Sequence, residues 1–252
     1  MNKAVTRALM IECGIPCPPG RVARKEDIIN VDEIEYPCVV KPTTTENSIG
    51  ITLVHAKEQM GSALEKAFSH SEEIIIDKFI PGREMRCSVV EKIDPFGNAE
   101  LIPFTPQEYH VKKFDLRKFD DKLRLGPDGL PLGNTIIICN LVVSLHMLLF
   151  SSGKASTTKA SFLSKEDEPE LFDRIQKLAV KVHRCLQFRD FSMVDVRVDL
   201  DGNPWILEVN LFSSFGPKSF LTIHAETVGW DQEDLFNVMM SNISRRRTLP
   251  IS

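Results

Sequence analysis

The clearest structural signal in the sequence is the segment from Met193 to Asn210, which reads MVDVRVDLDGNPWILEVN. Two predicted strands, 194–199 and 204–209, flank an Asp-Gly pair at 201–202, and Asp-Gly between such segments is a strong hairpin turn signal. The alternation of apolar and polar residues within each segment is typical of a half-buried strand. The stretch is therefore expected to form two antiparallel strands with one polar face.

Three oxygen-bearing side chains of this hairpin form a candidate metal site. Asp195 lies on the first strand, whereas Glu208 and Asn210 lie two residues apart on the second and so share a face. Carboxylate and carbonyl oxygens are the ligands that Mg²⁺ takes together with phosphate oxygens and water. A solvated hairpin face would show the same alternation, so both interpretations stay open at this point.

Two lysines stand at the ends of apolar runs that predict buried strands. Lys41 ends the run 37–41, and Lys78 follows the run 74–76. Lysine is rarely buried unless it is paired, so these positions indicate an anion site, although surface lysines with stems along apolar neighbours give the same pattern. The polar loop 43–50 offers hydroxyls, amides and a glycine to a phosphate chain. The sequence contains neither a Walker A motif nor GxGxxG.

The rest of the chain mixes hairpins with amphipathic helices, which predicts an α+β class and not a doubly wound parallel sheet. The highly charged stretch 107–133, rich in Gly and Pro, is expected to be loop or lid. Helices are predicted over residues 2–13, 57–69, 169–187 and 232–244, and strands over 37–41, 51–54, 74–76, 85–91, 194–199 and 204–209.

Composition places the chain among ordinary globular proteins. It has 252 residues, 42% hydrophobic and 26% charged, with a formal net charge of −4. These values exclude a fibrous or disordered chain and give no overall attraction to nucleic acid or anionic membrane. The N-terminus lacks the features of a signal peptide, which predicts a cytoplasmic protein. Buried reduced thiols are then expected for the six cysteines, Cys13, Cys17, Cys38, Cys87, Cys139 and Cys185.

One apolar run, 136–150, has no obvious place in this pattern. It is shorter than the roughly 20 residues that span a bilayer, and polar residues interrupt it. Three interpretations stay open: a buried strand or helix, a membrane anchor, or an insertion foreign to the fold. We expect an insertion over about 134–152 and no membrane contact.

Three segments together resemble the ATP-grasp superfamily, and within it the D-alanine–D-alanine ligases. Residues 36–54 (YPCVVKPTTTENSIGITLV) resemble the family's strand, lysine and phosphate-covering loop. Residues 74–90 (IIIDKFIPGREMRCSVV) resemble its adenine hinge, and 193–210 its metal-binding hairpin. The resemblance implies an ATP-grasp fold of two α+β subdomains, 1–78 and 79–252, with nucleotide bound between antiparallel sheets.

The resemblance also implies an activity. A ligase of this family is ATP- and Mg²⁺-dependent, with two ions expected and Mn²⁺ as a substitute, and joins a carboxylate to an amine through an acyl-phosphate. Its substrates are ATP and amino acids, and homo-oligomers occur. Two alternatives stay open: a truncated or diverged protein that binds nucleotide without ligase activity, and a ligase for a different amino acid or peptide.

Family roles carry over to individual positions of this sequence. The implied catalytic residues are Lys118, which reaches the transferred phosphate, Ser219, which holds an amino-acid carboxylate, and Arg197. Asp77 is expected to accept from the adenine amino group through its side chain or adjoining backbone, and Glu84 to bind the ribose hydroxyls. The other implied nucleotide contacts are Lys3, Lys41, Ser48, Lys78, Ile80 and Leu207, and the implied metal ligands are Asp195, Glu208 and Asn210.

Several positions depart from the family pattern. Met193 stands where the family has an arginine that stabilises the tetrahedral intermediate, and Arg197 on the same strand face is a candidate substitute. Phe119 replaces a tyrosine, and Glu46 and Asn47 replace a small Gly-Ser pair in the phosphate loop. The resemblance also begins at the family's central domain, which predicts a shortened relative with altered substrate contacts.

Overall fold

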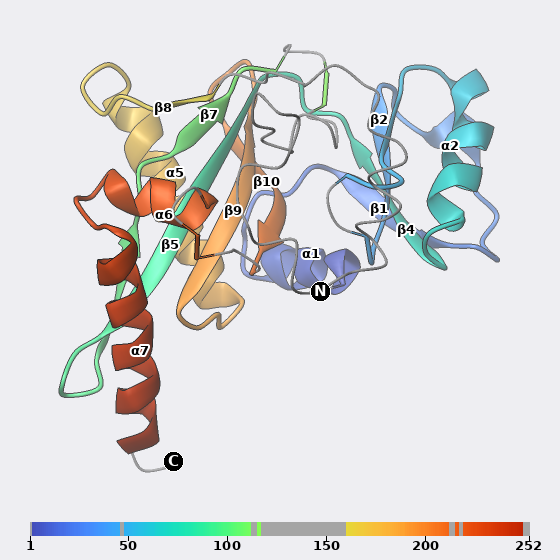
Figure 1. Ribbon diagram of the computed structural model, residues 1–252. Helices are drawn as coiled ribbons and strands as arrows, with labels where there is room; N and C mark the ends of the chain where they lie inside the picture. Colours follow the sequence, from blue (N-terminus) through green and yellow to red (C-terminus); the bar gives the residue numbers. More distant parts are fainter. Residues whose placement is uncertain are drawn as a thin grey trace, which may run out of the picture.

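Two antiparallel sheets organise the computed structural model, which describes residues 2–45, 48–111, 115–116, 160–211, 215–216 and 219–248 (Figure 1). The smaller sheet has the order β1-β4-β2-β3. Its strands are β1 (Gly20–Arg24), β2 (Cys38–Pro42), β3 (Thr52–Val54) and β4 (Glu73–Lys78), with the short helices η1 (Val31–Glu33) and η2 (Lys57–Gln59) in the connections.

Helix α2 (Met60–Phe68) covers one face of this smaller sheet. Its buried residues Met60, Ala63 and Ala67 pack against Val40 and Ile74 of the sheet. Each of these side chains is at most 1% exposed, so the small sheet has an apolar core of its own.

The larger sheet has the order β10-β9-β5-β7-β8, with β6 paired to β5 as well. The long central strand β5 lies beside β9, and the two carry the functional face described below. The strands are β5 (Arg83–Ile93), β6 (Ala99–Pro103), β7 (Gln107–Tyr109), β8 (Ala160–Phe162), β9 (Phe191–Val198) and β10 (Pro204–Asn210).

Successive side chains along β5 and β9 point to opposite faces of the larger sheet, and each face packs against different helices. Met85 and Cys87 on β5, with Val194 and Val196 on β9, face α5 (Pro169–Cys185) in one apolar cluster. The intervening positions face the opposite side. There Val90 packs with α6 (Phe220–Glu226) and α7 (Gln232–Thr248), and the polar residues between form the candidate site.

A β-bulge sets the register of the last hairpin. Ile206 pairs with Val196, but the next paired residue on β10 is Glu208, which lies opposite Asp195. One extra residue, Leu207, is therefore inserted on the β10 side. Without the bulge Leu207 would lie opposite Asp195, so the bulge is what brings the two carboxylates together.

Helix α1 (Lys3–Glu12) links the two sheets. Its first residue donates a backbone hydrogen bond from Lys3 N to Thr43 O beyond β2, at 2.9 Å. After the helix, Ile206 N of β10 donates to Pro16 O at 2.8 Å. The N-terminal part of the chain thus contacts both sheets and lies beneath the space between them (Figure 1).

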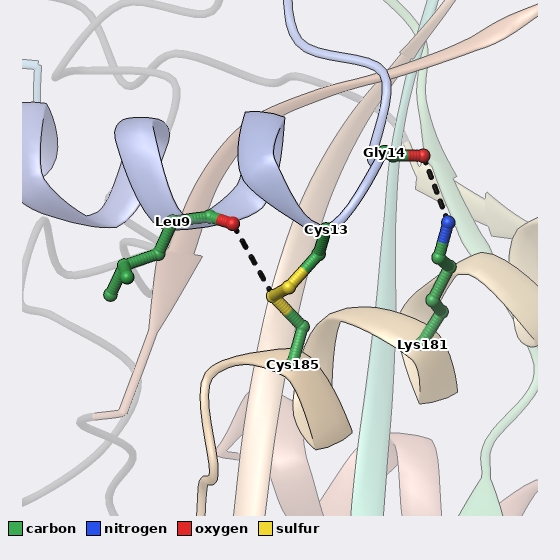
Figure 2. Close-up of a disulfide and its surroundings, with 5 residues drawn as sticks. All are labelled: Leu9, Cys13, Gly14, Lys181 and Cys185. Atoms are coloured by element: carbon green, nitrogen blue, oxygen red, sulfur yellow. Dashed lines mark hydrogen bonds between the residues drawn. A yellow bond between two sulfur atoms is a disulfide. The ribbon is translucent and has the colours of Figure 1, made fainter.

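A disulfide joins Cys13, just after α1, to Cys185 at the end of α5 (Figure 2). Beside it Lys181 Nζ donates to Gly14 O at 2.8 Å. The expectation that all six cysteines are reduced is therefore wrong for this pair, because the fold brings two residues 172 positions apart to adjacent helix ends. Cys17, Cys38 and Cys87 are free, and Cys139 lies outside the described residues.

The predicted helices and strands are confirmed with shifts of a few residues at their ends. The prediction of a loop over 107–133 is wrong for residues 107–109, which form β7. These polar residues form a strand because they pair with β5. Strands β1 and β8 and helix α6 were not predicted. Residues 134–152 lie outside the described part of the chain. None of the described helices combines the length and apolarity needed to cross a membrane.

Candidate active site

Two adjoining hollows lie between the sheets. One is bounded by α1 and β10, and the other by the hinge between β4 and β5. They share Lys41, Asp77, Leu207 and Glu208, so they are two parts of one cleft. Residues predicted from three separate sequence segments therefore lie around one space.

Lys41 and Asp77 form the ion pair at the centre of the cleft. Lys41 Nζ lies 2.8 Å from Asp77 Oδ2, and Arg7 Nε of α1 lies 3.3 Å from Asp77 Oδ1. The Asp77 carboxylate is 2% exposed and balances two cations. Its side chain is thus engaged in ion pairs within the protein, and its predicted contact with an adenine amino group, through the side chain or the adjoining backbone, stays a prediction.

Lys3 is the second lysine of the cleft. Its Nζ lies 3.6 Å from Glu208 Oε1 and also donates to Thr45 O. It is the first residue of α1, so the positive end of the helix dipole adds to its charge. The result is an anchored cation at the α1 end of the cleft.

The hinge end of the cleft is built around Arg197. Its guanidinium donates to Ile80 O at 3.0 Å and to Glu84 Oε2 at 3.2 Å, and lies 5.1 Å from the centre of the Phe79 ring. Arg197 is 1% exposed, and this burial lowers its pKa from the ordinary value, although Glu84 opposes the shift. These contacts orient Glu84 and the hinge, and the predicted substitution of Arg197 for the family's catalytic arginine stays a prediction.

Arg86 of β5 holds the carboxylate of Asp195 on the neighbouring strand. Arg86 Nε and Nη2 donate to the two oxygens of Asp195 at 2.6 and 2.9 Å. Asn210 Nδ2 donates to Asp195 Oδ2 at 3.2 Å. All three side chains project from the polar face of β5, β9 and β10, because Arg86 lies opposite Asp195 in the sheet.

The three predicted metal ligands differ in how well they fit a cation. Glu208 has one long contact to Lys3, and Asn210 faces Asp195 through its nitrogen and not through its coordinating oxygen. Both fit a Mg²⁺ ion whose other ligands are phosphate oxygens and water. Asp195 fits poorly, because both of its oxygens accept from a guanidinium. No group of three or more His, Cys, Asp or Glu side chains suited to a metal occurs in the described ranges.

The other predicted residues are placed as follows. Ser48, Lys78, Ile80 and Leu207 line the hinge end of the cleft, and Lys78 also pairs with Glu35. Ser219 is the N-cap of α6, where its Oγ accepts from Thr222 N at 3.2 Å. The predicted roles of these residues stay predictions. Lys118 lies outside the described residues.

The cleft carries more positive than negative charge. Asp77, Glu84, Asp195 and Glu208 are its acidic residues named above, and each is paired with at least one cation. Among the described residues, the cations that line the cleft are Lys3, Arg7, Lys41, Lys78 and Arg197, so five positive side chains face four carboxylates. A polyanion therefore finds an electrostatically favourable site in a chain whose formal net charge is −4.

Sequence reasoning missed Arg7 and Arg86. Arg7 follows Lys3 by one helical turn, a spacing that puts both on one face of α1. Arg86 follows Glu84 by two positions on a predicted strand, which puts both on one face. The signals were present, but only the pairing of strands and helices shows which carboxylates these arginines meet.

The fold and the site define the class. Antiparallel sheets enclosing a cationic cleft form the ATP-grasp fold, and a solved D-alanine–D-alanine ligase from Bacillus anthracis, complexed with ATP, matches 98% of this chain and 67% of its own, with a TM-score of 0.68 and 20% identity. The VanG D-Ala:D-Ser ligase from Enterococcus faecalis matches 96% of this chain and 61% of its own, with a TM-score of 0.68 and 22% identity.

The family follows from sequence. The model of the D-ala D-ala ligase C-terminus matches residues 9–122 and 148–241, and the chain belongs to this family. The D-alanine–D-alanine ligase of Borrelia hermsii is 26% identical over 251 residues, 96% of this chain and 60% of the relative. An uncharacterised protein, y4sG, of Sinorhizobium fredii is 24% identical over 248 residues, 97% of this chain and 63% of the relative. The chain thus spans less than two thirds of these relatives.

Proposed function

We propose that this chain binds ATP in the cleft between its two sheets and uses it to join a carboxylate to an amine, as a ligase of the D-alanine–D-alanine type. The observation that carries the proposal is the set of anchored cations around Lys41 and Asp77, at the junction of both sheets. Membership of the ligase family supports the same activity.

The hinge end of the cleft suits a nucleoside. Phe79, Ile80 and Leu207 offer apolar surface to a purine, and Leu207 is placed there by the β10 bulge. Glu84, oriented by Arg197, offers a carboxylate to the ribose hydroxyls. This end of the cleft would fix the nucleotide so that its phosphates point toward Lys41 and Lys3.

The phosphate end of the cleft suits phosphoryl transfer. The substrate carboxylate oxygen attacks the γ-phosphorus, the bond to the β-phosphate oxygen breaks, and ADP leaves. The amine then attacks the carbonyl carbon of the acyl-phosphate, loses a proton, and expels phosphate. Lys41 and Lys3 are held by Asp77 and Glu208, so they stabilise the developing charge without reorganising. A Mg²⁺ ion held by Glu208 and Asn210 would neutralise phosphate charge.

Thermal unfolding with and without Mg·ATP tests nucleotide binding. Wild type is expected to gain about 2.7 kcal/mol at a hundredfold excess over Kd. Lys41→Met is expected to lose most of this gain, because the variant lacks a cation that lines both hollows of the cleft. Lys92→Met, which changes an exposed lysine on β5, is the matched control and should keep it. A wild type that does not respond to Mg·ATP contradicts the proposal.

Phosphate release with pairs of amino acids then tests the ligase step. Release that requires both a carboxylate and an amine, with an amide product in the mass spectrum, supports the ligase. Nucleotide binding without such release favours the diverged, non-ligating alternative. Release with an acid other than D-alanine identifies a ligase of different specificity.

A further inference from the structure

The pair between Arg86 and Asp195 is the feature of the cleft that the proposed reaction does not use. The guanidinium makes two parallel hydrogen bonds, 2.6 and 2.9 Å, to the two carboxylate oxygens. This bidentate geometry is the strongest that arginine and a carboxylate form. Arg86 is 6% exposed and Asp195 is 4% exposed, so water does not compete for either group.

The surroundings of Arg86 hold its charge in place. The guanidinium carbon lies 4.8 Å from the centre of the Phe220 ring and 5.9 Å from that of Tyr109. Burial is the largest influence and disfavours the charged form, but Asp195, Tyr109 and Glu208 together outweigh it, so the pKa of Arg86 lies above its ordinary value. Aromatic rings and a buried carboxylate together fix a permanent cation at this position.

A divalent ion at Asp195 would have to displace or share this contact. Oδ2 accepts from both Arg86 and Asn210, and Oδ1 accepts from Arg86. A metal on either oxygen would lie a few ångströms from the guanidinium, where like charges repel strongly because the pair is out of water. Glu208 differs, because within the described ranges its one ion pair, with Lys3, is 3.6 Å long and leaves its other oxygen for a ligand.

We propose that Arg86 is a built-in cation that occupies Asp195 in place of a divalent metal, so that this chain binds nucleotide with one divalent ion, held by Glu208 and Asn210, and not with two. The inference rests on the proposed function, since the remaining ion is the one that accompanies the nucleotide. It assigns Asp195 to Arg86, in contrast to its predicted role as a metal ligand.

Counting Mn²⁺ ions tests the proposal without relying on activity. Purified chain is titrated with Mn²⁺ in the presence of saturating ADP, and bound Mn²⁺ is measured by electron paramagnetic resonance. Wild type is expected to bind one ion per nucleotide. Asp195→Asn should change the Mn²⁺ affinity less than twofold, because the amide oxygen still accepts from Arg86 and no metal ligand is lost. Arg86→Gln is expected to raise the count from one ion to two.

Arg83→Gln is the matched control, because Arg83 is another β5 arginine in bidentate pairs, with Glu108 and Glu168, and neither of these carboxylates is a predicted metal ligand. Its Mn²⁺ count should equal that of wild type. Two ions in wild type, or a tenfold loss of Mn²⁺ affinity in Asp195→Asn, would overturn this inference and leave the proposed function standing. Absence of ADP binding in wild type would overturn the proposed function and, with it, this inference. If Arg86→Gln does not fold, the Mn²⁺ count of wild type and the Mn²⁺ affinity of Asp195→Asn still test the inference.

Discussion

The imidazole of His183 is 2% exposed between α5 and β9, where its Nδ1 lies 2.9 Å from Ser192 Oγ. Burial lowers its pKa below the ordinary 6.5, and the nearby carboxylates of Glu91 and Asp190 only partly oppose this shift. In the unfolded chain His183 therefore binds a proton near pH 6.5, whereas in the folded chain it stays neutral at this pH. The contribution of His183 to stability is complete above pH 6.5 and is lost as pH falls toward its folded pKa.

His183→Gln removes this titration, so the free energy of unfolding should fall less steeply between pH 7 and pH 5.5 than in wild type. The difference in slope is at most about 1.4 kcal/mol per pH unit, since one proton is involved. Urea unfolding at several pH values measures it. His55→Gln, at an exposed histidine, is the matched control and should keep the wild-type slope. Equal slopes in His183→Gln and wild type would refute the assignment.

Single residues of the site could be predicted where the neighbouring residues in the sequence form a recognisable strand pattern. Lys41 ends an apolar run and Glu208 lies in a polar-alternating strand, and both line the cleft. Their partners were not predictable in the same way. Arg86 meets Asp195 only because β5 pairs with β9 in one register, a contact between residues 109 positions apart. The periodicity of apolar residues shows which side chains share a face of a strand, whereas ion pairs between strands depend on which strands are neighbours and in which register.

Elements were predicted better than their pairing. The apolar spacing of residues 169–187 predicted α5, because a long amphipathic helix has a strong signal. Strand β1 was missed because Gly20–Arg24 is short and mostly exposed, and it is a strand only through pairing with β4. The β10 bulge was also missed, since nothing in WILEVN distinguishes a bulged strand from a regular one.

The Cys13–Cys185 disulfide is the covalent link between α1 and α5, and its removal tests how much it stabilises the fold. It closes a long stretch of chain, so Cys185→Ser should lower the free energy of unfolding by about 2–5 kcal/mol, through a less restricted unfolded chain. Chemical denaturation of both proteins without reductant measures this. Dithiothreitol supplies the control, because it should destabilise wild type and leave Cys185→Ser unchanged. Thiol counting that finds both cysteines free in wild type would contradict the link.

The two sheets have separate apolar cores, one under α2 and two on the faces of the larger sheet. The hinge between β4 and β5 joins them through Gly82, whose φ is 146° and where a Cβ would lie 1.9 Å from Val198 O. The sequence predicted two subdomains, but their boundary stays a prediction, because α1 belongs to the N-terminal part and contacts both sheets.

A ligand that bridges two separately packed sheets should protect both from opening. Lys41 and Asp77 belong to the smaller sheet, and Glu208 and Arg197 to the larger, so Mg·ATP bound in the cleft links strands of each. Hydrogen exchange with mass spectrometry is expected to slow in peptides from β2 and β4 and also in peptides from β9 and β10. Peptides from α7, which does not line either hollow of the cleft, are the internal control. Slowing confined to one sheet would show that the nucleotide does not occupy the space between them, because only a bridging ligand lowers the free energy of both closed sheets together.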